Sequence, residues 1–161
     1  MIQINSISYS VEQNRKLLSN ISLNLSKGRL YGVIGHNGSG KSTLMRLLSG
    51  DITPTSGSIL VDGLPLHQLS TKEAAKHIAY LPQRLPEAAD FLVQELVALG
   101  RFPYQKWLQK PTEFDVQIVE QAMESTSVTQ FAKQPVNSLS GGEKQRVWLA
   151  MCLPNKHPIY C

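Results

Sequence analysis

One glycine-rich stretch, GHNGSGKS at residues 35–42, restricts the fold of this 161-residue chain more than any other feature. A short apolar run, LYGVI at residues 30–34, precedes it, and leucines with helical spacing follow it. So much glycine excludes regular structure within the stretch itself. The expected order is therefore a buried strand over residues 30–34, a glycine loop, and a helix with Gly50 as its C-cap.

The glycine stretch fits the pattern GxxxxGK[ST], which is typical of loops that bind nucleoside triphosphates. Bare backbone N–H groups can surround phosphate oxygens, Lys41 supplies a cation for the β- and γ-phosphates, and Ser42 offers a hydroxyl to Mg²⁺. The alternative is a glycine turn with an incidental lysine. The pattern does not distinguish a kinase from a GTPase or a transport ATPase. The residues expected to bind the nucleotide are Gly35, His36, Asn37, Gly38, Ser39, Gly40, Lys41, Ser42 and Thr43.

The composition gives only weak information about the compartment and the binding partners of the protein. The formal net charge is +4, without a block of five like charges, so a nucleic-acid-binding face is not required. No run of eighteen apolar residues occurs, and the N-terminus lacks the pattern of a secretory signal. Cys152 and Cys161 have no zinc-type or CxxC spacing, which fits a reducing cytosolic compartment.

The N-terminal half has the pattern of a strand-rich domain. Residues 2–7 and 17–25 alternate apolar with polar positions and predict a hairpin-like sheet. A further strand is expected over residues 58–61, and a turn at Asp62-Gly63. The spacing Ser70-x-x-Glu73 predicts a capping box that opens a short helix through His77, before a buried strand over residues 78–81.

Residues 91–128 have a different character. Apolar residues fall at helical spacings in two segments, on either side of Arg101-Phe102-Pro103-Tyr104. An all-helical insertion into the strand-rich domain is therefore expected. The resulting fold class is α/β.

A second phosphate-binding pattern lies near the end of the chain, where Leu139, Ser140, Gly141, Gly142 and Glu143 spell LSGGE. A hydroxyl and two bare backbone positions open a helix, an arrangement suited to phosphate oxygens. The plainer alternative is an N-capped helix with flexible glycines. The stretch NSLSGGEKQR resembles, without a gap, the signature of the ATP-binding cassette (ABC) family.

The resemblance covers residues 1–153 and implies a P-loop ABC cassette that binds ATP and Mg²⁺. It implies an N-terminal antiparallel β subdomain, an incomplete RecA-like core and a helical insertion. In this family each signature completes the ATP site of a second ATP-binding subunit in a two-fold dimer. Gln83 corresponds to the Q-loop glutamine, which with Ser42 reaches Mg²⁺, and Tyr9 to a ring that stacks on adenine. Tyr9 could instead simply pack on the sheet.

Residues 77–108 are similar to the ATPases of importers for ferric siderophores, ferric citrate, heme and vitamin B12. The whole match is nearest to the ferric-hydroxamate (ferrichrome-type) subgroup. The resemblance implies a subunit that energises siderophore import and lies on the cytoplasmic face of the bacterial inner membrane. Its partners would be a second, identical ATP-binding subunit in a homodimer and a membrane permease that contacts residues 85–102. The resemblance implies neither a nucleic-acid partner nor direct contact with the siderophore. For Phe102 and Tyr104 ordinary packing is the alternative.

The family continues after its signature helix into a strand that ends in Asp-Glu, where the Asp orders Mg²⁺ and the Glu activates water, and a later His contacts the γ-phosphate. No Asp or Glu follows Glu143 here, so no catalytic residue other than Gln83 is intact. Residues 154–161 are interpreted as an out-of-frame tail. One added base after the codon for Leu153 lets the same bases encode Leu-Ala-Gln-Gln-Thr-Pro-Tyr-Leu-Leu. A short natural product or an artificially shortened chain are the alternatives.

The expected division is a core of residues 1–90 and 138–153 with a helical subdomain of residues 91–137. The favoured function is an importer ATPase subunit defective in hydrolysis, whose open sheet edge is prone to aggregation. Two other functions stay open. One is a nucleic-acid- or ribosome-associated ABC protein, and the other is a non-catalytic fragment that binds ATP.

Overall fold

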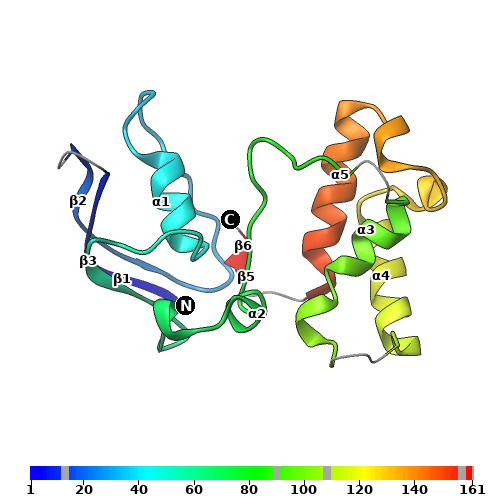
Figure 1. The fold of residues 1–161 in the computed structure, drawn as a ribbon, viewed down its shortest axis with the longest axis horizontal. Coiled ribbons are helices and arrows are strands. Elements are labelled where there is room, and N and C mark those ends of the chain that lie inside the picture. Colours follow the sequence, from blue (N-terminus) through cyan, green and yellow to red (C-terminus); the bar gives the residue numbers. More distant parts are fainter. Residues whose placement is uncertain (12–14, 89–90, 107–109, 156–158, 161) are drawn as a thin grey trace. The chain divides into compact units, whose positions relative to one another are not determined.

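The computed structural model describes residues 1–11, 15–88, 91–106, 110–155 and 159–160. The chain forms two compact units, Met1–Ala79 and Tyr80–Tyr160 (Figure 1). The expected tail therefore lies partly outside the described residues, at positions 156–158 and 161.

The first unit is built on an antiparallel sheet with the strand order β2-β1-β3-β4. Its strands are β1 (Ile2–Val11), β2 (Arg15–Leu25), β3 (Ser56–Val61) and β4 (Leu64–Pro65). This arrangement confirms the expected N-terminal hairpin, in which Ile4 lies opposite Leu23.

The isoleucines of β1 bury one face of this sheet although their spacing is uneven. Ile2, Ile4 and Ile7 are all buried. The register shifts between Ile4 and Ile7, and Ser6 has a φ of 49° at that point. A β-bulge adds one residue to a strand, so it returns Ile7 to the face that Ile2 and Ile4 occupy.

The turn at Asp62-Gly63 forms as expected. Both residues have positive φ, 51° and 85°, which is the conformation of a type I′ hairpin turn. Asp62 also accepts ion pairs from Lys27 Nζ at 2.8 Å and from the Met1 amino group at 2.6 Å. These contacts, with Lys27 as the stronger, lower the pKa of Asp62 to about 2.

Helix α1 (Lys41–Leu48) follows the glycine loop and buries Leu44, Leu47 and Leu48. Gly50 lies just beyond its C-cap, Ser49, and has a φ of 79°. Its N–H bonds to the carbonyl of Leu47, and the next N–H returns to Arg46. Gly50 is therefore the left-handed residue directly after the C-cap rather than the expected C-cap itself, and this helix ending requires such a residue.

The buried strand expected over residues 30–34 is absent. The segment is coil between β2 and α1 (Figure 1), and Leu30 and Ile34 are 100% and 97% exposed. A continuous apolar run forms a buried strand only where strands flank it on both sides and other elements cover both of its faces. Among the described residues no strand pairs with it, so its propensity alone does not make it a strand.

Two further elements are shorter than expected. The capping box of Ser70 and Glu73 is present, but helix α2 (Thr71–Ala74) ends before His77. Strand β5 covers Ile78–Ala79, rather than all of residues 78–81. Pro82 restricts the residue before it and removes a backbone donor, which limits strand pairing there. A short 3₁₀ turn, η2, covers Leu66–Gln68.

The second unit confirms the helical pattern of residues 91–128. Its helices are α3 (Val93–Leu99), α4 (Glu113–Ser125) and α5 (Gly141–Cys152). In the described part of this unit, 3₁₀ turns connect or extend them at Phe102–Tyr104, Thr129–Phe131, Val136–Ser138 and Leu153–Asn155, and strand β6 covers Ile159–Tyr160. The core of the unit includes Val93, Leu96, Val97, Val119, Ala122, Met123, Val147 and Trp148. No helix of the described part of the chain is long and apolar enough to cross a membrane.

A buried charge network holds the segment between α3 and α4, which the sequence pattern did not indicate. Arg101 is only 8% exposed and donates to Asp115 Oδ1 at 2.8 Å and to the Pro154 carbonyl at 3.0 Å. Its guanidinium lies 4.5 Å from the centroid of the Tyr104 ring. Asp115 also closes the capping box of α4 with Thr112. The pairing gives Arg101 a structural role in this unit.

Replacing Asp115 with Asn should weaken the second unit and remove part of its acid sensitivity. Hydrogen bonds from Thr112 and then Arg101 lower the pKa of Asp115 from 3.8 to about 2. A lowered carboxyl pKa stabilises the fold above pH 4, by about 2 kcal/mol here, and this is lost as the pH falls from about 4 to about 2. Helical circular dichroism during acid titration and urea unfolding would measure both effects.

The matched control is Asp51→Asn, which removes an exposed ion pair with Arg46 in the first unit. Exposed pairs contribute about 0–1 kcal/mol, so this variant should unfold like the parent chain. Equal acid unfolding of Asp115→Asn and the parent would contradict the role given to the network.

Candidate phosphate-binding site

The glycine loop, residues 35–42, requires glycine for two different reasons. Gly38 and Gly40 have φ angles of 82° and 91°, a region that side chains rarely adopt. At Gly40 a Cβ would also lie 2.6 Å from Leu18 Cδ2 and 3.0 Å from the Leu17 carbonyl. The loop is therefore packed against β2 at its last glycine, while its preceding residues stay exposed.

Lys41 is the first residue of α1 and folds back over the loop. Its Nζ donates to the carbonyls of Gly35 at 2.7 Å and His36 at 2.8 Å. The turn is closed further by a 3.2 Å bond from Ser39 N–H to the His36 carbonyl. The ammonium group thus lies against the loop, where it can exchange these carbonyls for phosphate oxygens.

Neither the N-cap nor the first turn of α1 supplies a side-chain acceptor or a carboxylate to the N-terminus of this helix. Its N-cap is Gly40, which offers no side-chain acceptor, and its first turn contains no acidic residue. Unsatisfied N–H groups and the helix dipole make such an end favourable for an anion. Ser42 is exposed in this first turn and Thr43 is half-buried.

The N-terminus of α5 differs because a capping box occupies it. Ser140 accepts from Glu143 N–H, and both its N–H and hydroxyl donate to Glu143 Oε2, at 2.8 and 2.6 Å. The Ser140 hydroxyl lowers the pKa of Glu143. The capped-helix alternative for LSGGE therefore describes the local structure correctly, and Leu139 is buried in the core of the unit.

Within the part of the chain that the structure describes, nothing requires glycine at Gly141 or Gly142. A Cβ at either position would meet nothing within 4 Å, and neither has a positive φ. Glycine inside a helix costs about 0.5–1 kcal/mol relative to alanine. The fold therefore has room for side chains at both positions. Glycine at both positions instead leaves space for a group from outside the chain to approach the backbone closely.

Replacing Ser140 with Ala should destabilise the second unit by about 1 kcal/mol, since the helix loses its N-cap. Ser140→Asn is the matched variant, because asparagine caps equally well. Urea unfolding should show a lower midpoint for the alanine variant alone. Equal midpoints for both variants and the parent would show that the capping box contributes nothing.

The remaining candidate residues lie in different units. Tyr9 belongs to the first unit and lies opposite Leu18 on β2, the same leucine that packs against Gly40. Leu18 is therefore a neighbour of both Tyr9 and the glycine loop. Gln83 belongs to the second unit, as do residues 139–143, and its side chain is exposed.

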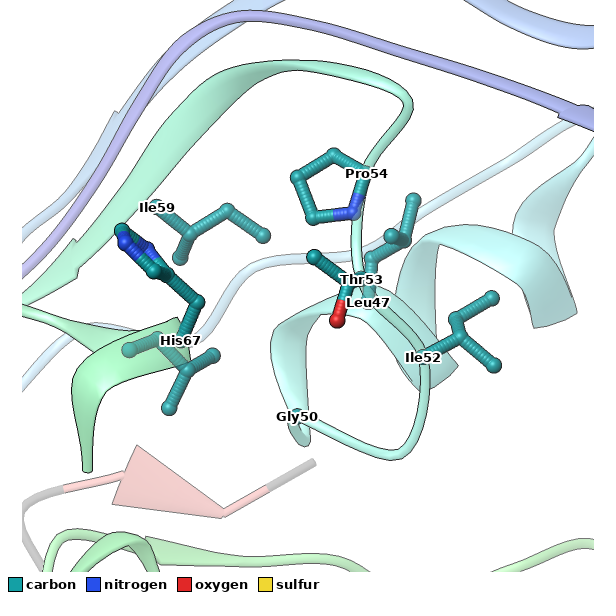
Figure 2. A pocket seen from close by; sticks show the side chains of 8 residues that line it. Leu47, Gly50, Ile52, Thr53, Pro54, Ile59 and His67 are labelled. Atoms are coloured by element: carbon teal, nitrogen blue, oxygen red, sulfur yellow. The ribbon is translucent and has the colours of Figure 1, made fainter. Parts of the chain in front are cut away.

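The first unit has a pocket at the other end of α1. Figure 2 shows a pocket beside the C-terminal end of this helix and β3, lined by Leu47, Ile52, Pro54 and Ile59. Thr53 and His67 are its polar side chains. It lacks the converging donors of the glycine loop and is distinct from that loop.

Comparison with known proteins identifies the family of the chain. The sequence profile of the family described as ABC transporter matches residues 18–161. The chain is 41% identical over 141 residues to the achromobactin transport ATP-binding protein CbrD of Dickeya dadantii, covering 87% of this chain and 52% of that relative. It is 36% identical over 140 residues to the iron(3+)-hydroxamate import ATP-binding protein FhuC of Bacillus subtilis, with the same coverage of both chains.

The fold is also similar to solved cassettes. The dimeric structure of MJ0796, a bacterial ABC transporter cassette, matches with a TM-score of 0.85 and 26% identity, over 99% of this chain and 72% of that chain. The chain spans about half the length of the two curated relatives. With its glycine loop and signature helix, the chain belongs to the ABC transporter family and has the α/β fold of that family's ATP-binding cassettes.

Proposed function

We propose that this chain is an ATP-binding subunit, or the N-terminal part of one, that serves an importer of ferric siderophores. The observation that carries the proposal is the open anion site of the first unit. There Lys41 lies over residues 35–40 and the first turn of α1 has no carboxylate. A polyphosphate matches this combination of bare N–H groups, a helix N-terminus and a cation.

On this proposal the triphosphate replaces the loop carbonyls as the partner of Lys41. The N–H groups of the loop and of Ser42 and Thr43 then surround the phosphate oxygens. Tyr9 stacks on the adenine ring, and its link to Gly40 through Leu18 is consistent with that role. Nucleotide binding is thus a property of the first unit.

Magnesium fits the first turn of α1 as a companion of the nucleotide. Ser42 offers an exposed hydroxyl, and Gln83 is the proposed second protein ligand. Within the described ranges no group of three His, Cys, Asp or Glu side chains could hold a metal by itself. Phosphate oxygens and water would therefore supply most ligands, as is usual for Mg²⁺ with nucleotides.

Hydrolysis by these 161 residues should be weak. Residues 144–161 contain no Asp or Glu, so they provide no carboxylate to order Mg²⁺ or to position the attacking water. Phosphoryl transfer depends on that positioning. We therefore expect ATP binding without appreciable turnover.

The signature, residues 139–143, is proposed to contact ATP held by a second subunit. Gly141 and Gly142 leave room that the fold itself does not use, and the related cassette MJ0796 is dimeric by its description. The siderophore assignment depends on the relatives named for achromobactin and iron(3+)-hydroxamate. A permease partner, with residues 85–102 as its contact, and a place on the cytoplasmic face of the inner membrane follow from the same proposal.

The test is competition against a fluorescent ATP analogue in the presence of Mg²⁺. ATP should compete at least about tenfold better than AMP, because AMP lacks the β- and γ-phosphates that Lys41 recognises. Release of inorganic phosphate should stay at the buffer rate. Equal competition by AMP, or no binding of the analogue, would contradict the nucleotide site.

A further inference from the structure

The capping box that opens α5 keeps the hydroxyl proton of Ser140 inside the chain. The Ser140 hydroxyl donates to Glu143 Oε2 at 2.6 Å, and the Ser140 N–H donates to the same oxygen at 2.8 Å. A serine hydroxyl has one proton, so it cannot donate to Glu143 and to an outside oxygen at the same time. Hydrogen bonds to a carboxylate are also stronger than those between neutral groups. In the free chain this donor is therefore already engaged.

The N-termini of α1 and α5 differ in their electrostatics. The first turn of α1, which follows the glycine loop, contains no acidic residue. The first turn of α5 contains Glu143, and hydrogen bonds from Ser140 lower the pKa of its carboxyl group, which keeps it ionised. A carboxylate in this position compensates the positive end of the helix dipole and repels a second anion. The end of α5 should therefore attract a phosphate less than the end of α1 does.

The residues that follow the cap distinguish α5 from the other capped helices. Capping boxes also open α2, α3 and α4, and residues with side chains follow the cap in each of them. In α5 the next two residues are Gly141 and Gly142, where a Cβ would meet nothing within 4 Å. A cap that served stability alone would not need glycine there, because glycine weakens a helix. The carboxylate of α5 thus lies beside backbone that an outside group can approach.

We propose that Glu143 is an internal competitor for the phosphate that the signature receives, and that it must release Ser140 before ATP of a second subunit can bind there. This inference rests on the proposed function, in which residues 139–143 contact ATP held by a second subunit. Glu143 is a positioning residue, because it acts through Ser140 and the N-terminus of α5. Its displacement opposes pairing at each of the two sites of a two-fold dimer.

Replacing Glu143 with Gln should strengthen ATP-dependent pairing of the chain at least about tenfold. Glutamine removes the charge, and its side-chain oxygen still accepts from Ser140 N–H, so the capping box is kept. The neutral amide holds the Ser140 hydroxyl less strongly than the carboxylate does. A gain of about threefold at each signature gives about tenfold for the pair, because both sites of the dimer contribute.

Sedimentation equilibrium of the 161-residue chain, with and without ATP and Mg²⁺, measures this pairing. The expected lack of turnover keeps the ATP intact during the run. The matched control is Glu73→Gln, which makes the same change in the capping box of α2 and should pair like the parent chain. Urea unfolding of both variants should give midpoints close to that of the parent, so that a change in pairing is not a change in folding.

Binding of the fluorescent ATP analogue to dilute, unpaired chain separates this inference from the proposed function. Glu143→Gln should leave that affinity unchanged, because Lys41 and the glycine loop belong to the first unit. Absence of analogue binding in every variant would contradict the nucleotide site itself, and this inference with it. With binding intact, the inference is overturned by unchanged or absent pairing of Glu143→Gln, by an equal gain in Glu73→Gln, or by a gain that does not need ATP.

Discussion

ATP binding should fall about 10- to 150-fold when Lys41 is replaced by Ala. A hydrogen bond to a charged group contributes about 1.5–3 kcal/mol, and every 1.4 kcal/mol is a factor of ten in affinity. The same variant loses the two bonds to the carbonyls of Gly35 and His36. Without them the loop is less ordered before the nucleotide arrives, which weakens binding further.

Competition titration of a fluorescent ATP analogue measures this effect. The matched control is Lys72→Ala, which removes the same charge from an exposed position on α2 of the same unit. It should bind ATP within about twofold of the parent, because surface charges at a distance are largely screened. Similar losses in both variants would mean that general charge, rather than the glycine loop, attracts the nucleotide.

Replacing Gly100 with Ala should destabilise the second unit by about 1–3 kcal/mol, the usual cost of overpacking. Gly100 is the C-cap of α3 and has an ordinary helical φ of −57°. Conformation alone would thus make alanine favourable by about 1 kcal/mol. The opposite sign is expected because the added Cβ would overlap the backbone carbonyl of Met151 in α5. A helix backbone cannot move aside as a side-chain tip can.

Urea unfolding followed by helical circular dichroism would test the prediction. Gly142→Ala is the matched control, since a Cβ there meets nothing within 4 Å. It should be neutral or stabilising by up to about 1 kcal/mol. If Gly100→Ala were as stable as Gly142→Ala, the inference that α5 approaches α3 too closely for a side chain at Gly100 would be wrong.

Sequence patterns correctly predicted those features that depend only on residues close together in the chain. The Ser70–Glu73 capping box, the turn at Asp62-Gly63 and the glycine stop at Gly50 all form as their residues indicate. In each case the side chain or the left-handed backbone that makes the feature lies within a few residues of it. Helical spacing was likewise sufficient for α3 and α4, because their apolar faces pack on one another within one unit.

Arg101 shows where sequence reasoning was insufficient. Beside Phe102 and Tyr104 it looks like one more surface cation, whereas it is buried and paired with Asp115. Phe102, the aromatic residue next to it, is instead 63% exposed. The carboxylate that compensates the buried charge of Arg101 belongs to Asp115, which lies fourteen residues further along the chain. The only available signal was the Thr-x-x-Asp spacing, which predicts a cap rather than an ion pair.

The sequence by itself predicted the phosphate loop and the signature, and it identified the family, because these depend on residue types at fixed short spacings. It also determined the helical character of residues 91–128. Only the tertiary structure decided that residues 30–34 are exposed coil and that Met151 requires glycine at Gly100. It also decided that no described residue requires glycine at Gly141 or Gly142. Exposure and close approach depend on which distant segments are present to pack, and that information is not contained in any local stretch.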